Sequence, residues 1–104
     1  MIKSDFMKTL SKLSLISATK NAVYCNVGDE IAILSMKDEF YYGLNSIGAF
    51  IWNLVQEPKT LNEVERAILN EYDVEEETCY NDLKEIIKDL MDKGLIEVKN
   101  ENSI

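Results

Sequence analysis

The 104-residue sequence contains no histidine, one proline and two cysteines. Histidine is the commonest general base and the commonest metal ligand in proteins, so its absence argues against most hydrolase mechanisms and many metal sites. Cys25 and Cys79 lie 54 positions apart, without the CxxC or Cys-His spacing of a zinc site. Two free thiols, buried or partly buried, are favoured over a disulfide, because no framework of regular cysteine spacings is present.

Phosphate-binding loops are also missing. Gly43 precedes an expected helix, and Gly48 lies in its first turn. This segment has neither the P-loop lysine nor the dinucleotide fingerprint. The acidic residues follow helical solvent faces instead of a calcium-loop pattern, and the glutamates at 75–77 are interpreted as helix-start charges. We therefore expect no catalytic residue, no metal site, no cofactor and no enzyme activity.

Long hydrophobic runs are absent as well. No stretch of about 18 apolar residues exists, so no membrane-spanning segment is expected. Residues 1–16 carry three lysines and have no clean hydrophobic block before a cleavage site, which argues against a signal peptide. We expect a cytoplasmic protein without a membrane partner.

The net charge of −8 is unevenly distributed. Residues 1–20 hold four lysines and one aspartate, whereas residues 57–98 hold 13 acidic and five basic residues. A field of this sign opposes a nucleic-acid backbone and favours a neutral or basic partner, although a solvated surface explains most acidic faces equally well.

Three β-strands are predicted in the first half of the chain, over residues 22–27, 30–36 and 40–44. Gly28-Asp29 supplies the first turn, so the strands form an antiparallel meander. The second strand has apolar residues at both its odd and its even positions, which predicts a central strand covered on both faces. The third strand is expected at an edge, unless the segment at 95–98 or the N-terminal segment pairs with it.

Three helices are predicted in the second half. The first begins with Ser46 as N-cap and stops before Pro58. The second begins at Thr60 with a capping box, and the third runs over residues 75–93 and ends at Gly94. The apolar stripe of the third helix is wide, so one flank is expected to remain partly open. That flank consists of Cys79, Asp82, Ile86 and Asp89.

The strand at 40–44 and the helix after it carry a family resemblance. The segments YYGLN and IGAFIWNLV, a Thr-capped second helix and the ending DLMDKGLIEV resemble the PqqD family of small pyrroloquinoline quinone biosynthesis proteins. Relatives of PqqD are the precursor-peptide recognition elements of ribosomal peptide biosynthesis (RiPP recognition elements). The similarity covers about residues 22–98, and its most specific part is GDEIAILSMKDEFYYGLNSIGAFIW.

The resemblance implies an α+β fold like a winged helix-turn-helix, with a three-stranded antiparallel sheet followed by three helices. It implies a non-catalytic protein that binds a leader peptide as a fourth strand. The peptide would then be presented to a modifying enzyme, such as a radical SAM enzyme or the leader protease of a lasso peptide pathway. The implied peptide-binding residues are Glu39, Phe40, Tyr41, Tyr42, Gly43, Leu44, Cys79, Asp82, Leu83, Ile86, Asp89 and Leu90.

Two features depart from the family pattern. Lys37-Asp38-Glu39 occupies a turn that contains glycine in many relatives, which leaves the hairpin register open. Residues 1–20 form an extension, expected to be mobile or loosely docked, before a domain at 21–99 and a tail at 100–104.

Two other functions remain as alternatives. A winged-helix DNA-binding regulator fits the same elements, but residues 75–93 hold seven acidic residues and three lysines in the helix that would enter the major groove. A homodimer would use the exposed strand for self-pairing.

Overall fold

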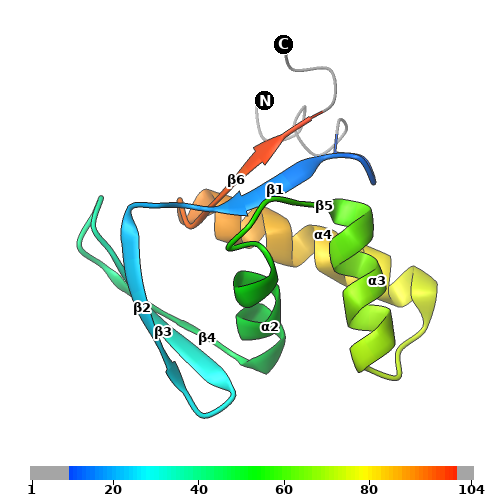
Figure 1. Ribbon diagram of the computed structural model, residues 1–104, viewed down its shortest axis with the longest axis horizontal. Helices are drawn as coiled ribbons and strands as arrows, with labels where there is room; N and C mark the ends of the chain where they lie inside the picture. Colours follow the sequence, from blue (N-terminus) through cyan, green and yellow to red (C-terminus); the bar gives the residue numbers. More distant parts are fainter. Residues whose placement is uncertain (1–9, 101–104) are drawn as a thin grey trace.

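The computed structural model, which describes residues 10–100, has an α+β fold in which two three-stranded antiparallel sheets pack with helices around one core (Figure 1). The first sheet has the order β2-β3-β4, from β2 (Ala22–Val27), β3 (Glu30–Ser35) and β4 (Tyr41–Leu44). The second has the order β5-β1-β6, from β5 (Lys59–Thr60), β1 (Leu15–Ala18) and β6 (Ile96–Lys99). The helices of the described part are α2 (Ser46–Leu54), α3 (Leu61–Glu71) and α4 (Glu76–Asp92).

The predicted fold class and the predicted meander are confirmed. β3 is the central strand of its sheet, and β4 is an edge strand. The expectation that β3 is covered on both faces is wrong, because the helices cover one face alone. Ile31 and Ile33 are buried against the core, whereas Ala32 and Leu34 on the opposite face are half-buried.

The turn between β3 and β4 contains an unusual backbone conformation. Glu39 has a φ of 61°, in the left-handed region that favours glycine. Its amide donates to the Ser35 carbonyl at 2.8 Å, and the Ser35 amide donates to the Phe40 carbonyl at 2.9 Å. The Asp38 carboxylate accepts from the Phe40 amide, the chief contact that holds the pKa of Asp38 below its ordinary value. The departure from a glycine-containing turn therefore leaves the hairpin closed, with a strained residue at position 39.

Replacing Glu39 by glycine should increase the free energy of unfolding by about 0.5–1 kcal/mol, because glycine adopts positive φ without a Cβ clash. Chemical denaturation followed by circular dichroism measures the change. Lys37→Gly is the matched control in the same turn and should be neutral or destabilising, since no positive φ is relieved there. A loss of stability in Glu39→Gly would contradict this account of the turn.

The N-terminal segment is built into the second sheet. β1 pairs with β6 through four residue pairs, from Leu15↔Lys99 to Ala18↔Ile96, and with β5 through two. The carbonyls of Lys12 and Ser14 accept hydrogen bonds, each 2.9 Å long, from the first amides of α3. The expected mobile or loosely docked extension is therefore wrong for residues 10–20, whereas residues 1–9 and 101–104 lie outside the described part.

The helix boundaries largely follow the predicted signals. α2 begins at Ser46, but its N-cap is Asn45, whose side chain accepts from the Gly48 amide at 3.0 Å, so the cap predicted at Ser46 is wrong by one residue. The capping box of α3 is confirmed, with reciprocal bonds between Thr60 and Glu63. α4 ends before Gly94, which has a φ of 73°.

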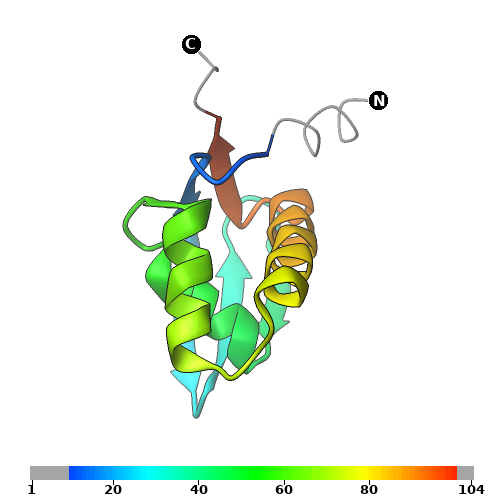
Figure 2. The ribbon, with the colours of Figure 1, turned by 90° about the vertical axis from the view of Figure 1, so that its right-hand side faces the viewer.

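The core lies between the first sheet and the helices. Trp52 of α2 is fully buried, and the Tyr24 ring meets its indole edge to face, with ring centroids 5.4 Å apart. Figure 2 shows α3 and α4 standing side by side in front of the strands. Within residues 10–100, no helix is long and apolar enough to cross a membrane.

Candidate peptide-binding groove

The free edge of β4 exposes backbone hydrogen-bonding groups. Ser35 is hydrogen-bonded opposite Phe40, and the antiparallel register continues as Ile33↔Tyr42. Hydrogen-bonded pairs alternate along such a ladder, so the backbone N–H and C=O groups of Tyr41 and Gly43 point away from β3. No strand within residues 10–100 pairs with this edge. β4 can therefore accept one more strand.

A groove of about 630 Å³ lies beside this edge, between β4 and α4. One wall comes from the end of β4 and the first turn of α2, and the other comes from α4. Gly48 permits the close approach of α2 to β4, because a Cβ at this position would lie 3.2 Å from the Leu44 Cβ. The groove is lined by Gly43, Leu44, Asn45, Ile47, Gly48, Ile68, Val74, Thr78, Cys79, Asp82, Leu83, Glu85, Ile86, Asp89, Leu90 and Lys93.

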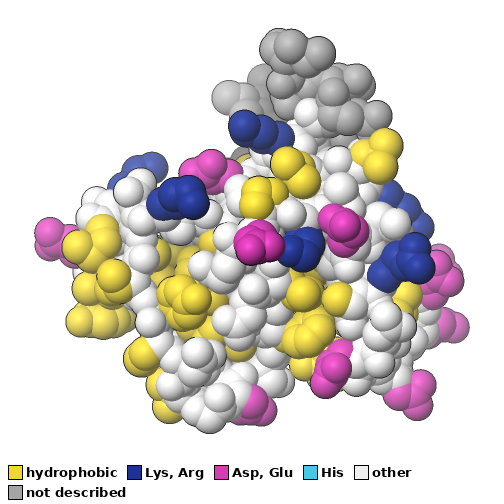
Figure 3. Space-filling model, in the orientation of Figure 1, with side chains coloured by type: hydrophobic (Ala, Val, Ile, Leu, Met, Phe, Trp, Pro, Cys, Tyr) yellow, Lys and Arg dark blue, Asp and Glu magenta, His cyan; other side chains and the backbone are white. Residues whose placement is uncertain are grey.

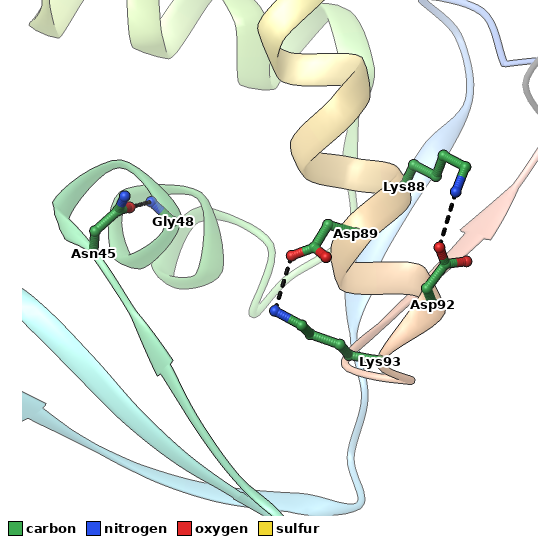
Figure 4. A network of polar contacts seen from close by, with 6 residues as sticks. All are labelled: Asn45, Gly48, Lys88, Asp89, Asp92 and Lys93. Carbon is green, nitrogen blue, oxygen red and sulfur yellow. Dashed lines mark hydrogen bonds and ion pairs between the residues drawn. The ribbon is translucent and has the colours of Figure 1, made fainter.

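The two sides of the groove differ in charge. The β4 and α2 side carries apolar and amide side chains, whereas α4 contributes Asp82, Glu85 and Asp89, and its C-cap is Lys93. Lys93 forms an ion pair with Asp89 at 2.9 Å on the side of α4 that faces β4, as Figure 4 shows. The Lys93 ammonium also lies 5.8 Å from the centroid of the Tyr42 ring. A lysine therefore stands at one end of the groove, and the other charged residues of the α4 wall are acidic.

Cys79 lies in the groove but is 6% exposed. Burial raises the pKa of its thiol above the ordinary value, and the negative charges of Glu65, Asp82 and Glu76 raise that pKa further. Cys25 is also free but exposed on β2. The expectation of two free thiols holds in the structure, whereas the expectation that Cys25 is buried or partly buried is wrong.

At pH 8 the two thiols should react with Ellman's reagent at rates that differ by about tenfold or more, Cys25 being the faster. The reacting species is the thiolate, and the raised pKa and burial of Cys79 reduce both its thiolate fraction and its access. Absorbance at 412 nm follows both phases. Cys25→Ser should remove the fast phase and Cys79→Ser the slow one; equal rates in these variants would refute the assignment.

The structure brings most of the predicted site residues together. Both predicted walls border the groove, although the strand contributes less side-chain surface than expected. Residues from the predicted set that line the groove are Gly43, Leu44, Cys79, Asp82, Leu83, Ile86, Asp89 and Leu90.

Four predicted residues do not line the groove. Glu39 and Phe40 belong to the turn before β4, and Tyr41 is 78% exposed on the outer face of the sheet. Tyr42 is half-buried on the inner face of β4, and its hydroxyl donates to the exposed Asp38 carboxylate at 3.0 Å. Tyr41 is relevant to strand addition through its backbone alone.

Several groove residues escaped the sequence-based prediction. Glu85 and Lys93 share a face of α4 with Asp82 and Asp89, so helical spacing carries a signal for them. Val74 lies between α3 and α4, and Ile68 comes from α3, where the sequence gives no sign of the groove. The others that were missed are Asn45, Ile47, Gly48 and Thr78.

The outer face of the first sheet is apolar, and no element of residues 10–100 covers it. Val23 and Val27 of β2 are 56% and 60% exposed. In Figure 3, hydrophobic side chains also gather at the left-hand end, over the turn between β3 and β4. Exposed apolar surface of this kind often marks a contact with another macromolecule.

Two solved structures resemble this fold. TbiB1 in complex with the TbiA(beta) leader peptide has a TM-score of 0.73 and 32% sequence identity, with coverage of 78% of this chain and 94% of that chain. A lasso peptide synthetase B1 complexed with the leader peptide has a TM-score of 0.69, with coverage of 79% and 96%. Its identity of 17% shows a shared fold alone.

Comparison of the sequence with known protein families identifies the family of this chain. No curated protein matches the chain. The family profile described as Coenzyme PQQ synthesis protein D (PqqD) matches residues 30–96, which contain both walls of the groove. The match covers more than half of the sequence, and the identity with TbiB1 agrees with it. The chain therefore belongs to the PqqD family.

Proposed function

We propose that this protein binds the leader region of a ribosomally synthesised precursor peptide by β-strand addition to β4. The observation that carries the proposal is the unpaired edge of β4 beside an apolar groove. The leader-peptide complex of TbiB1, a relative with 32% identity, supports it. In this proposal the peptide backbone pairs with Tyr41 and Gly43, and alternate side chains enter the groove.

The energetics require the groove as well as the strand edge. Four to six backbone hydrogen bonds contribute about 1 kcal/mol each, whereas ordering the peptide costs about 1–2 kcal/mol per residue. Micromolar affinity corresponds to about 8 kcal/mol. Burial of apolar peptide side chains against the exposed and half-buried apolar residues of the groove, Ile47, Val74 and Ile86, supplies the difference at about 25 cal/mol per Å². Selectivity then arises from those side chains.

A titration of fluorescein-labelled TbiA(beta) leader peptide, followed by anisotropy, tests the binding function directly. A dissociation constant in the micromolar range or below, together with much weaker binding of a scrambled peptide, is the expected result. Equal binding of the two peptides would contradict sequence-selective recognition.

We further propose that the protein presents the bound peptide to a modifying enzyme or a leader protease and catalyses no step itself. The lack of histidine supports the second half of this proposal. The outer face of the first sheet, which the rest of residues 10–100 leaves exposed, supports the first half, because outward side chains of an added strand would extend that same face. A single-turnover assay of the partner enzyme with and without this protein tests presentation: acceleration is expected, and an unchanged rate contradicts it.

The charge of α4 does not favour DNA binding. This helix contains six acidic residues and two lysines, and the charged residues of α4 that line the groove, Asp82, Glu85 and Asp89, are all acidic. A duplex phosphate backbone would be repelled by such a surface.

Self-association through β4 would compete with the leader, so sedimentation velocity with and without peptide distinguishes a homodimer from the proposed complex.

A further inference from the structure

The groove has a charge gradient along α4. Asp82 and Glu85 are exposed and form no ion pair within residues 10–100, whereas Asp89 is neutralised by Lys93. The field of Asp82 also reaches the groove floor, since it contributes to the raised pKa of Cys79. Two uncompensated carboxylates therefore stand on one part of the wall, and an ammonium group stands at its end.

The direction of β4 relates this gradient to a bound strand. β4 begins near Lys93, whose ammonium lies 5.8 Å from the Tyr42 ring centroid, and ends at Leu44, next to Asn45 (Figure 4). Strand pairs in the described sheets are antiparallel. A peptide that continues this pattern starts beside Asn45 and the acidic part of the wall, and it ends beside Lys93.

The spacing sets the length of peptide that is read. Asp82 and Lys93 are 11 residues apart on α4, or about 16 Å at 1.5 Å per residue. A β-strand covers that distance with about five residues. Side chains of a strand alternate between its two faces, so every second side chain of a bound five-residue strand would face the apolar floor of the groove.

We propose, on the basis of the leader-binding function above, that the groove selects a peptide strand with a lysine or arginine near its N-terminal end. This basic side chain lies against Asp82 and Glu85, and apolar side chains occupy the alternate positions that face Leu83 and Ile86. The uncharged β4 wall contributes backbone pairing without charge selection. The acidic part of α4 thus fixes the direction and register of the peptide, in addition to its affinity.

A lysine and glutamate scan of the labelled TbiA(beta) leader peptide tests this selection. Each position is changed in turn to lysine and to glutamate, and anisotropy at about 50 mM salt gives the affinity, since low salt limits screening. At one or two positions the lysine peptide should bind about 3- to 10-fold more tightly than the glutamate peptide. In the Asp82→Asn/Glu85→Gln variant this preference should disappear, so that the lysine and glutamate peptides bind with about equal affinity.

A matched variant separates local from overall charge. Glu77→Gln/Glu97→Gln changes the net charge equally, at exposed positions outside the groove, and should keep the lysine preference. Equal affinity of lysine and glutamate peptides at every position would overturn the charge selection and leave the leader-binding function standing. A preference that survives in Asp82→Asn/Glu85→Gln would also overturn it. Failure of the parent peptide and of every scan member to bind would contradict both proposals.

Discussion

Replacing Gly43 by proline is expected to weaken leader-peptide binding about 10- to 100-fold while leaving the fold intact. The Gly43 N–H points to the free edge of β4, so proline removes a donor that the bound peptide needs and leaves a peptide carbonyl unpaired. The proline ring also occupies the path of the incoming strand. Anisotropy titration with the leader peptide measures the loss, and each tenfold change corresponds to about 1.4 kcal/mol.

Gly43→Ala is the matched control for this prediction. A Cβ at position 43 meets no atom within 4 Å, and alanine keeps the N–H, so binding should change little. Thermal unfolding should show that Gly43→Pro remains folded, because proline is tolerated on an edge strand where the N–H makes no ladder bond. Equal loss of binding in both variants would point to side-chain crowding, and unchanged binding in Gly43→Pro would reject strand addition at β4.

Replacing Ile16 by alanine is expected to lower the free energy of unfolding by about 2–4 kcal/mol. Ile16 is fully buried in the core from the central strand of the second sheet. A loss of this size is a large part of the roughly 5–15 kcal/mol that stabilises a typical domain. Urea denaturation, followed by the fluorescence of the single tryptophan Trp52, measures it.

Leu15→Ala provides the control within the same strand. Leu15 is 38% exposed, so its truncation should cost less than about 1 kcal/mol. If Ile16→Ala were as stable as Leu15→Ala, β1 would contribute little to the fold. The earlier expectation of a loosely docked segment would then regain support for residues 10–20.

Local sequence signals predicted most elements of the first sheet and the helices. Gly28-Asp29 defines the first hairpin, the capping box at Thr60 defines the start of α3, and Gly94 ends α4. Each of these signals acts within a few residues, through a turn conformation or a side-chain cap. The error at the start of α2 has the same local character, because Asn45 and Ser46 are both good caps and the difference lies in one backbone conformation.

The second sheet could not be predicted in this way. Leu15 pairs with Lys99 across most of the chain, and β1 has only four residues. A short strand with serine and alanine carries no clear periodicity, and its pairing partner cannot be identified from local composition. The resemblance to the PqqD family began near residue 22 and gave no expectation for β1.

The candidate site shows the same division. The open flank of α4 followed from its apolar stripe, and Cys79, Asp82, Ile86 and Asp89 line the groove as a helical face requires. Tyr41 faces outward in the structure, because the inner face of β4 is taken by Tyr42 and Leu44, so we expect its backbone alone to take part in the proposed strand addition.

The sequence by itself determined the α+β class, the three helices of the described part and the acidic face of α4, because these depend on caps, turns and periodicity within single segments. The sequence predicted an edge position for β4 unless a terminal segment paired with it, and only the tertiary structure decided that, within residues 10–100, β1 and β6 pair with each other instead. It also decided that this edge stands beside the apolar face of α4. Both outcomes depend on long-range packing, and both are needed for the proposed groove to take a peptide strand.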